Sequence, residues 1–271
     1  MMDHRVVEKT SAKSAGEALA APAGIVPDLD QTALLLDIDG TLLELAPTPR
    51  DVVVPPTLGS TLQALHDRLD GALALVSGRS LTDIDVIFAP LQFPAVGGHG
   101  AEMRLSVENE AVASHAPPMD NDLKRRFIAI SHLSPGILYE DKGYSIALHY
   151  RLAPQFERTI YEAVSAIRAD LPQAPIEVLP GKFVCEIKPA GFTKATGVRE
   201  LMNHAPFSGR NPIFIGDDVT DESVFAIMPA FRGVSFSVGR RAHGVDGQFR
   251  APKDVRAWLT QLIDDEAMAA Q

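Results

Sequence analysis

The chain has 271 residues, of which 46% are hydrophobic and 22% are charged, and its formal net charge is −10 at pH 7. Its length and composition are typical of a folded protein with one large or two smaller domains, and they exclude collagen-like, coiled-coil and low-complexity architectures. The negative charge opposes binding to nucleic acid and to anionic membranes, so we expect neither as a partner, and it leaves the oligomeric state open.

The compartment is predicted from the cysteine content and the N-terminal segment. The single cysteine, Cys185, cannot form an internal disulfide and lies in an apolar segment, which is typical of a packed thiol in a reducing compartment. Residues 1–29 are predicted to form a mobile extension without the apolar core of a signal peptide. No stretch approaches the roughly 20 apolar residues of a membrane-spanning helix. We therefore expect a cytoplasmic protein.

The first predicted strand ends in the most informative segment of the chain. Residues 33–36 form a continuous apolar run, as a buried parallel strand does, and Asp37 follows it directly. Open α/β sheets place their chemistry just beyond the carboxyl ends of such strands, so Asp37 stands where a nucleophile is expected. Gly40 allows a sharp turn, and Asp37 and Asp39 together could bind a metal ion and divide nucleophilic and acid/base roles.

After this segment, helices and strands alternate, which is typical of right-handed βαβ units around a parallel sheet. Apolar residues at helical spacing indicate the helices, and short continuous apolar runs indicate the strands. The pattern predicts helices over 58–69 and 81–88, strands over 72–76 and 94–96, and a tight strand end over 97–102.

The pattern changes near residue 105, where we place a domain boundary. Two helices and two hairpins are expected between residues 106 and 187, which makes this segment an α+β insert. The helices are predicted over 120–133 and 154–171, and the strands over 137–139, 144–150, 176–179 and 183–187, with turns at 141–143 and 180–181.

Beyond this insert, the alternation of strands and helices returns. Residues 30–105 and 188–271 are therefore expected to form one α/β core with a Rossmann-like parallel sheet, which carries the insert 106–187. Helices are predicted over 193–203, 221–228 and 252–263, and strands over 212–215 and 233–238.

Two further strand ends and one helix start carry residues that suit a phosphoryl group. The second strand ends on Ser77, Lys194 opens a helix, and Asp217 follows the strand after that helix. Together with Asp37 they supply a carboxylate nucleophile, a hydroxyl and an ammonium for phosphate oxygens, and acidic ligands for a divalent cation. Each signal is weak alone, and the acidic run 217–222 could also cap a helix with Thr220 at its N-cap.

These motifs, taken in order, resemble those of the haloacid dehalogenase (HAD) superfamily of aspartyl-phosphate phosphatases, over residues 33 to about 260. The resemblance implies a HAD core, and an insert between the second and third motifs implies a cap of the C2 type over the core site. Five shorter segments resemble the trehalose-6-phosphate phosphatase family more closely, although Ala195 stands where that family usually has glycine. They are 76–79, 98–102, 149–151, 181–182 together with Glu186, and 216–222.

The resemblance implies Mg²⁺-dependent hydrolysis of trehalose 6-phosphate. Asp37 would attack phosphorus, and Asp39 would protonate the leaving sugar oxygen and then activate water. Ser77 and Lys194 would hold phosphate oxygens. The resemblance also implies a metal site, in which Mg²⁺ would be bound by Asp37, the backbone carbonyl of Asp39 and Asp217. Asp218 and Asp221 would orient the water ligands of the ion or Lys194.

The insert is predicted to recognise the sugar. A strand period of two places Lys182 and Glu186 on one face, and Glu140 and Lys142 share a face across their turn. By resemblance these four would bind the glucose unit farther from phosphorus. Gly78, Arg79 and His99 would lie near the mouth of the core site. Two alternatives stay open: a capped phosphatase for another sugar phosphate, and an inactive homologue that binds a sugar phosphate and regulates a partner.

Overall fold

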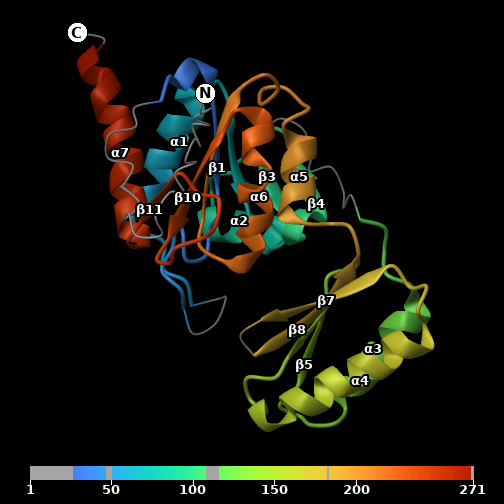
Figure 1. Ribbon diagram of the computed structural model, residues 1–271. Coiled ribbons are helices and arrows are strands. Elements are labelled where there is room, and N and C mark those ends of the chain that lie inside the picture. Colours follow the sequence, from blue (N-terminus) through green and yellow to red (C-terminus); the bar gives the residue numbers. More distant parts are fainter. Residues whose placement is uncertain (1–26, 47–50, 108–115, 182, 270–271) are drawn as a thin grey trace, which may run out of the picture.

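Two sheets organise the chain (Figure 1). The computed structural model describes residues 27–46, 51–107, 116–181 and 183–269. Most of the extension predicted over residues 1–29, and the predicted site residue Lys182, therefore lie outside the described residues. Among the described residues, no helix combines the length and the apolar character needed to cross a membrane.

The core sheet has seven strands in the order β11-β10-β9-β1-β2-β3-β4, and neighbouring strands are parallel except for β3 and β4. The chain winds outward from β1 in one direction through β2 and β3, and returns on the other side of β1 through β9 and β10. Such a reversal leaves a crevice at the carboxyl ends of the two central strands. The strands are β1 (Thr32–Leu36), β2 (Leu73–Val76), β3 (Ala95–Gly97), β4 (Glu102–Arg104), β9 (Asn211–Gly216), β10 (Val234–Val238) and β11 (Gly247–Phe249).

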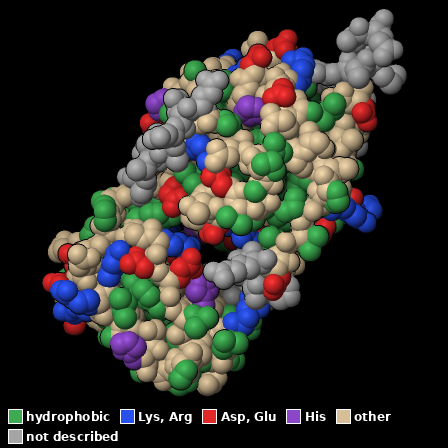
Figure 2. Space-filling view, turned by 180° about the vertical axis from the view of Figure 1, so that it is seen from behind, with side chains coloured by type: hydrophobic (Ala, Val, Ile, Leu, Met, Phe, Trp, Pro, Cys, Tyr) green, Lys and Arg blue, Asp and Glu red, His purple; other side chains and the backbone are tan. Residues whose placement is uncertain are grey.

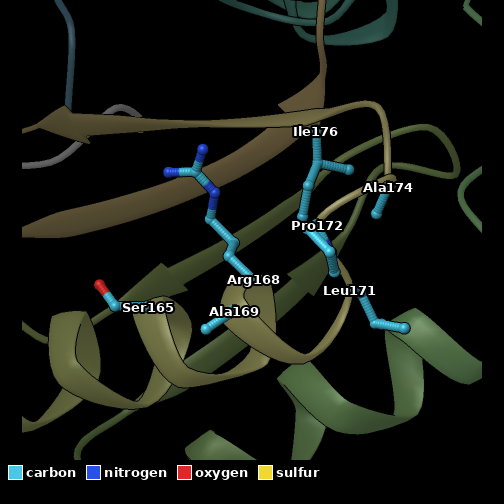
Figure 3. Close-up of a pocket in the computed structure, with 7 residues that line it drawn as sticks. All are labelled: Ser165, Arg168, Ala169, Leu171, Pro172, Ala174 and Ile176. Atoms are coloured by element: carbon cyan, nitrogen blue, oxygen red, sulfur yellow. The ribbon is translucent and has the colours of Figure 1, made fainter.

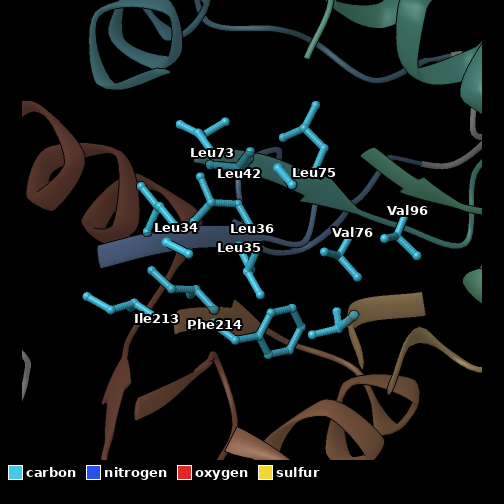
Figure 4. Packing of buried hydrophobic residues seen from close by; sticks show 14 of the residues in the cluster. Leu34, Leu35, Leu36, Leu42, Leu73, Leu75, Val76, Val96, Ile213 and Phe214 are labelled. Carbon is cyan, nitrogen blue, oxygen red and sulfur yellow. The ribbon is translucent and has the colours of Figure 1, made fainter. Parts of the chain in front are cut away.

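Helices cover both faces of this sheet, with α1 beside α7 and α5 beside α6 (Figure 1). Every residue of β1 is buried, because helices pack on both of its faces, and this explains its continuous apolar sequence. Leu36 packs among side chains of β2 and β9, such as Leu75 and Phe214 (Figure 4). The helices are α1 (Leu58–Arg68), α2 (Leu81–Phe88), α5 (Lys194–Leu201), α6 (Glu222–Phe225) and α7 (Pro252–Ala269).

The second sheet is antiparallel, in the order β5-β6-β8-β7, and α3 and α4 cover one of its faces. Leu148 and Cys185 lie opposite one another on that apolar face, whereas their neighbours Ala147 and Glu186 lie on the other face, toward the core. We call this second module the cap. Its elements are α3 (Asn121–Ser131), β5 (Leu138–Asp141), β6 (Ile146–His149), α4 (Glu157–Asp170), β7 (Ile176–Gly181) and β8 (Val184–Pro189).

The predicted fold class is confirmed, since a largely parallel core sheet carries a separate antiparallel insert. The chain passes to the cap between β4 and α3 and returns between β8 and α5. The strand β8 extends to Pro189, two residues past the predicted limit of the insert at residue 187. The boundaries of the folding units remain a prediction.

Three local predictions differ from the structure. Pro180 and Gly181 do not turn the chain but belong to β7, and Phe183, with a φ of 61°, lies in the turn that precedes β8. Proline is tolerated there because β7 is an edge strand, on which an N–H need not reach a neighbour. The helix predicted over 221–228 is only α6, since Pro229 lacks the N–H that would continue it past Phe225. The strands β4 and β11 were not predicted.

Gly197 allows α5 to pack closely on the sheet, and its replacement tests this packing. In most helix interiors alanine is more stable than glycine by about 1 kcal/mol. Here a Cβ would lie 2.4 Å from Val96 Cγ1 and 3.1 Å from the Cα of Gly100. We therefore expect Gly197→Ala to lower the free energy of unfolding by about 1–3 kcal/mol, as measured by urea denaturation.

The matched control is Gly59→Ala in α1, where the new Cβ would meet only the flexible end of Leu91, at 3.2 Å. This change is expected to leave the free energy of unfolding unchanged or to raise it by up to about 1 kcal/mol. A Gly197→Ala protein as stable as the control would contradict the close packing of α5.

Candidate active site

A buried ion cluster lies at the carboxyl ends of β1 and β9. Leu36 and Ile215 are register partners, so Asp37 and Asp217 leave the sheet almost side by side. The ammonium of Lys194 donates to Asp37 Oδ1 and to Asp221 Oδ1, at 2.7 Å each. The side chains of Lys194 and Asp37 are only 4% and 5% exposed, so this pair is shielded from bulk water.

The start of α5 fixes the position of Lys194. Thr193 is the N-cap of this helix and forms a capping box with Thr196, in which each side chain accepts a hydrogen bond from the backbone of the other residue. Such reciprocal capping satisfies N–H groups that the first helical turn leaves free. The lysine side chain therefore starts from a defined backbone position.

A cluster of carboxylates at this place could hold a cation. Asp37, Asp217 and Asp221 each offer an oxygen within 4.8 Å of the others. Gly40, with a φ of 79°, makes room for one of them, because a Cβ at this position would lie 2.1 Å from Asp217 Oδ2. Oxygen ligands are those that hard divalent cations prefer, so the residues present fit such an ion.

Electrostatics supports the same assignment. Burial raises the pKa of Asp37 well above its ordinary value, the ammonium of Lys194 opposes this shift, and repulsion by Asp221 and Asp217 adds to it. Burial, and then the Asp221 charge, raise the pKa of Asp217 to about 6. Burial opposes the charge of Lys194, but Asp221 and Asp37 raise its pKa overall. When ionised, Asp37, Asp217 and Asp221 thus carry more negative charge than the one ammonium of Lys194 balances.

Both carboxylate oxygens of Asp221 accept hydrogen bonds from other groups of the chain. Its Oδ1 accepts from Lys194, and its Oδ2 accepts the backbone N–H groups of Asp217 and Asp218 at 3.0 and 2.9 Å. It therefore orients both the lysine and the loop that carries Asp217. The alternative N-cap, Thr220, is wrong: the N-cap of the short 3₁₀ turn that follows is Asp218, which is exposed, and the N-cap of α6 is Asp221.

Asp39 is held by Arg79. The guanidinium donates from Nε to Asp39 Oδ2 at 2.5 Å and from Nη2 to Oδ1 at 2.6 Å, which is a bidentate ion pair. Ser77 lies buried at the end of β2, and its hydroxyl oxygen accepts the Arg79 N–H at 3.2 Å. The predicted core residues Asp37, Asp39, Ser77, Arg79 and Lys194 thus lie at one edge of the sheet.

The cap presents a second polar cluster toward the core. Glu186 Oε1 accepts from Ser145 Oγ at 3.1 Å and from Lys142 Nζ at 3.4 Å. Its other oxygen, Oε2, lies 3.8 Å from Nε2 of His99, which belongs to the core. Glu186 therefore lies where the two modules meet. Figure 2 shows a hollow between them, with acidic, basic and histidine side chains at its edge.

His99 occupies a constrained position at this junction. Its φ of 54° is in the left-handed region, and its ring packs where a Cβ on Gly78 would lie, 2.5 Å from Cε1 and Nε2. Burial lowers the pKa of His99 to about 4, against the opposing charge of Glu186. The ring is therefore neutral near pH 7, with one nitrogen able to donate and the other to accept.

Glu140 lies on the same cap face as Glu186, because both are register neighbours of Ala147. Its Oε2 lies 2.8 Å from Nε2 of His149, and the Glu140 side chain is 46% exposed. The predicted group Glu140, Lys142 and Glu186 is therefore on the core-facing side of the cap sheet, whereas Lys182 lies outside the described residues.

Two residues of this region were not predicted as part of the site. Arg240 follows β10 and donates from Nε to the backbone carbonyl of Asp217 at 2.7 Å. Arg240 could have been predicted as a site residue, because it lies two residues after the end of β10, a strand that neighbours β9. Tyr144 of the cap lies against the core where Gly98 leaves space, since a Cβ there would be 2.1 Å from the tyrosine oxygen. No signal in the sequence indicated this contact.

A separate hollow of about 420 Å³ lies on the cap, at the end of α4 (Figure 3). Arg168 is the only charged residue among those that line it, and they include no carboxylate. This hollow therefore lacks the acids that phosphoryl chemistry or a metal ion requires.

Comparison with known proteins identifies the family. The trehalose-phosphatase family matches residues 35–251, which include every motif described above. The chain belongs to the trehalose-phosphatase family. It is 38% identical over 246 residues to a trehalose-6-phosphate phosphatase of Escherichia coli, covering 90% of this chain and 91% of that protein. It is 41% identical over 235 residues to a probable trehalose-phosphate phosphatase of Sinorhizobium fredii, covering 85% and 88%.

Solved structures support the fold. The C-terminal domain of a Candida albicans trehalose-6-phosphate phosphatase superposes with a TM-score of 0.72 at 20% identity, over 87% of this chain and 93% of that one. A HAD-superfamily phosphatase from Bacteroides thetaiotaomicron superposes with a TM-score of 0.60 at 14% identity, over 89% and 98%. The predicted HAD fold is confirmed. The assignment of the insert to the C2 cap type remains a prediction.

The repulsion among the carboxylates makes a testable prediction for Asp217→Asn. The pKa of Asp217 in the folded protein, about 6, exceeds its ordinary value of 3.8, so the folded state binds this proton more tightly than the unfolded chain does. The free energy of unfolding of the metal-free protein therefore falls as pH rises from about 4 to about 6 and does not recover above that range. Removing the charge should reverse this loss.

In a chelator at pH about 7.5, Asp217→Asn is expected to melt at a higher temperature than the unchanged protein, and the gain should shrink at pH about 4.5. Thermal denaturation at both pH values measures this. Asp218→Asn, the control, removes an exposed carboxylate and should give a smaller gain. A metal-free Asp217→Asn protein that is less stable at the higher pH would show that repulsion does not dominate here.

Proposed function

We propose that this protein is a Mg²⁺-dependent phosphatase that hydrolyses trehalose 6-phosphate to trehalose and phosphate. The observation that carries the proposal is the buried Asp37, which lies between the ammonium of Lys194 and the carboxylate of Asp217 at the ends of two central strands. Membership of the trehalose-phosphatase family supports the same reaction.

Mg²⁺ would be held by the carboxylates of Asp37 and Asp217 and by the backbone carbonyl of Asp39. Its charge would reduce the repulsion between the nucleophile and an anionic phosphate and would polarise a phosphoryl oxygen. Asp221 does not serve as a ligand in this proposal, because Lys194 and two backbone N–H groups already use both of its oxygens.

The chemistry proceeds in two displacements on phosphorus. One oxygen of Asp37 forms a bond to phosphorus while the bond to the sugar oxygen breaks, and Asp39 gives a proton to that oxygen. Water then attacks phosphorus in the aspartyl-phosphate and gives a proton to Asp39. The bond between phosphorus and the Asp37 oxygen breaks, so that phosphate is released and the Asp37 carboxylate is restored. Two easier steps thereby replace one difficult displacement.

Lys194 and Ser77 would stabilise the charge on the phosphoryl oxygens. An ammonium has three N–H donors, and Asp37 and Asp221 occupy two of them. The third remains for a phosphate oxygen. The Ser77 hydroxyl oxygen accepts a backbone N–H, so its own proton is available to donate to the phosphoryl group.

Asp39 must leave Arg79 before it can contact the leaving sugar oxygen, because the guanidinium uses both carboxylate oxygens in this structure. An arriving phosphate is an anion that competes for the same guanidinium. In this proposal substrate binding draws Arg79 toward phosphate and frees Asp39 for proton transfer.

The cap would recognise the sugar ring that lies farther from phosphorus. Glu186, Lys142 and Glu140 supply carboxylates and an ammonium on the core-facing side, and His99 adds a neutral ring that can donate and accept. Such groups suit a ligand rich in hydroxyls. Lys182 is proposed as a further member of this set from the sequence alone. Gly78 is proposed to contribute by leaving space for the His99 ring.

Phosphate release from a panel of substrates tests the proposal. The panel is trehalose 6-phosphate, sucrose 6-phosphate and glucose 6-phosphate, each with Mg²⁺ and with EDTA. We expect the highest kcat/KM with trehalose 6-phosphate and no turnover in EDTA. A preference for the monosaccharide phosphate would contradict the substrate, turnover in EDTA would contradict the metal, and binding without turnover would indicate a regulator.

Asp37→Asn is the control for the nucleophile in this panel. An amide oxygen is a poor nucleophile, so turnover should disappear while the circular dichroism spectrum stays unchanged. Asp170→Asn, on the outer cap helix α4, changes an acid far from the core sheet and should leave kcat intact. Activity in Asp37→Asn would mean that another group attacks phosphorus.

Glu186→Gln tests the role of the cap. A hydrogen bond to a charged group contributes about 1.5–3 kcal/mol, so loss of this carboxylate should raise KM for trehalose 6-phosphate about tenfold or more. The KM for p-nitrophenyl phosphate, which has no sugar, should change far less. The control is Glu162→Gln on α4, where the Glu162 carboxylate pairs with the exposed Arg158 side chain. Equal effects on both substrates would exclude sugar recognition by Glu186.

A further inference from the structure

We propose that Arg240 is a positioning residue for the proposed metal site, which fixes the backbone of Asp217 so that its carboxylate points toward the cation. This inference rests on the proposed function, and it concerns a residue that neither binds the phosphate nor ligates the ion. Its basis is the pair of hydrogen bonds that Arg240 makes to the loop following β9.

The guanidinium spans this loop. Its Nε donates to the carbonyl oxygen of Asp217 at 2.7 Å, and its Nη2 donates to Glu222 Oε1 at 2.8 Å. Glu222 is the first residue of α6, so the two contacts lie at the start and at the end of the loop. One planar group with two donors thereby sets the distance between the strand end and the helix start.

The two peptide groups that flank the Cα of Asp217 are both held. Asp221 Oδ2 accepts the N–H groups of Asp217 and Asp218 from one side of the loop. Arg240 takes the carbonyl of the peptide that joins these two residues. With both peptide planes fixed, the backbone dihedral angles of Asp217 are fixed too, and the direction of its side chain follows from them.

Arg240 acts on the backbone, and so the carboxylate of Asp217 stays available. A cationic side chain that paired directly with the Asp217 carboxylate would compete with the metal ion for its oxygens. The ammonium of Lys194 competes in this way for one oxygen of Asp37. Arg240 is itself anchored, because its N–H donates to the Val238 carbonyl at 2.8 Å and the N–H of Gly239 donates to the Phe249 carbonyl at 3.0 Å. The strand β10 therefore supports the loop that follows its neighbour β9.

Groups that orient metal ligands typically change metal affinity by 10–100-fold when they are removed. Arg240 is partly exposed, with 36% of its side chain accessible, so we expect the lower end of that range. Arg240→Gln should weaken Mg²⁺ binding about tenfold, while kcat at saturating Mg²⁺ changes far less. Arg240→Lys keeps the charge but not the two-point contact, and should recover only part of the affinity.

The chain offers a matched control. Arg210 also donates to backbone carbonyls, those of Thr32 at 3.1 Å and Leu29 at 3.4 Å, but it does so at the opposite end of β1. Arg210→Gln is therefore expected to reduce stability without changing Mg²⁺ affinity. Glu222→Ala removes the second anchor of Arg240 and should weaken Mg²⁺ binding less than Arg240→Gln does.

The experiment is a calorimetric titration of the metal-free, full-length protein and its variants with MgCl₂ in the absence of substrate, together with the Mg²⁺ dependence of turnover. A weaker Mg²⁺ Kd in Arg240→Gln, with an unchanged Kd in Arg210→Gln, supports the inference. Unchanged Mg²⁺ affinity in Arg240→Gln, or an equal loss in Arg210→Gln, overturns it and leaves the proposed phosphatase function standing. An unchanged protein that binds no Mg²⁺ overturns both this inference and the metal in the proposed function.

Discussion

The site depends on the repulsion between the carboxylates of Asp37, Asp217 and Asp221. The parallel register of β1 and β9 brings Asp37 and Asp217 out of the sheet side by side, and burial makes their charges costly. Lys194 compensates for part of this charge, and Gly40 gives the Asp217 carboxylate its space. The loop contacts of Asp221 then keep these groups from moving apart. A cation held by these carboxylates, as proposed above, would reduce this repulsion.

Much of this arrangement was predictable because it is local in the sequence. The apolar runs of β1, β2 and β9 are continuous, and each is followed at once by a chemically active residue, such as Asp37, Ser77 or Asp217. The strands β4 and β11 have three residues each, too few to show a period, and they are defined only by the neighbour with which they pair.

Contacts between distant segments were less predictable. The period of two placed Glu186 on one face of its strand, but its approach to His99 depends on how the cap sits on the core. Arg79 was assigned to substrate from its motif, and only the structure shows it on Asp39. The misplaced turn at Pro180 has a similar origin, since whether proline fits a strand depends on whether that strand lies at an edge.

The two connections between the modules are unequal in length, and this determines how the cap can move. The outgoing connection, from β4 to α3, spans residues 105–120, whereas the return from β8 to α5 spans only residues 190–193. Lys188 also donates to the carbonyl of Phe192, which tightens the short connection further. The cap is therefore tethered beside Lys194, and any rotation of the cap about this short connection would have its pivot next to the ammonium that is proposed to bind phosphate.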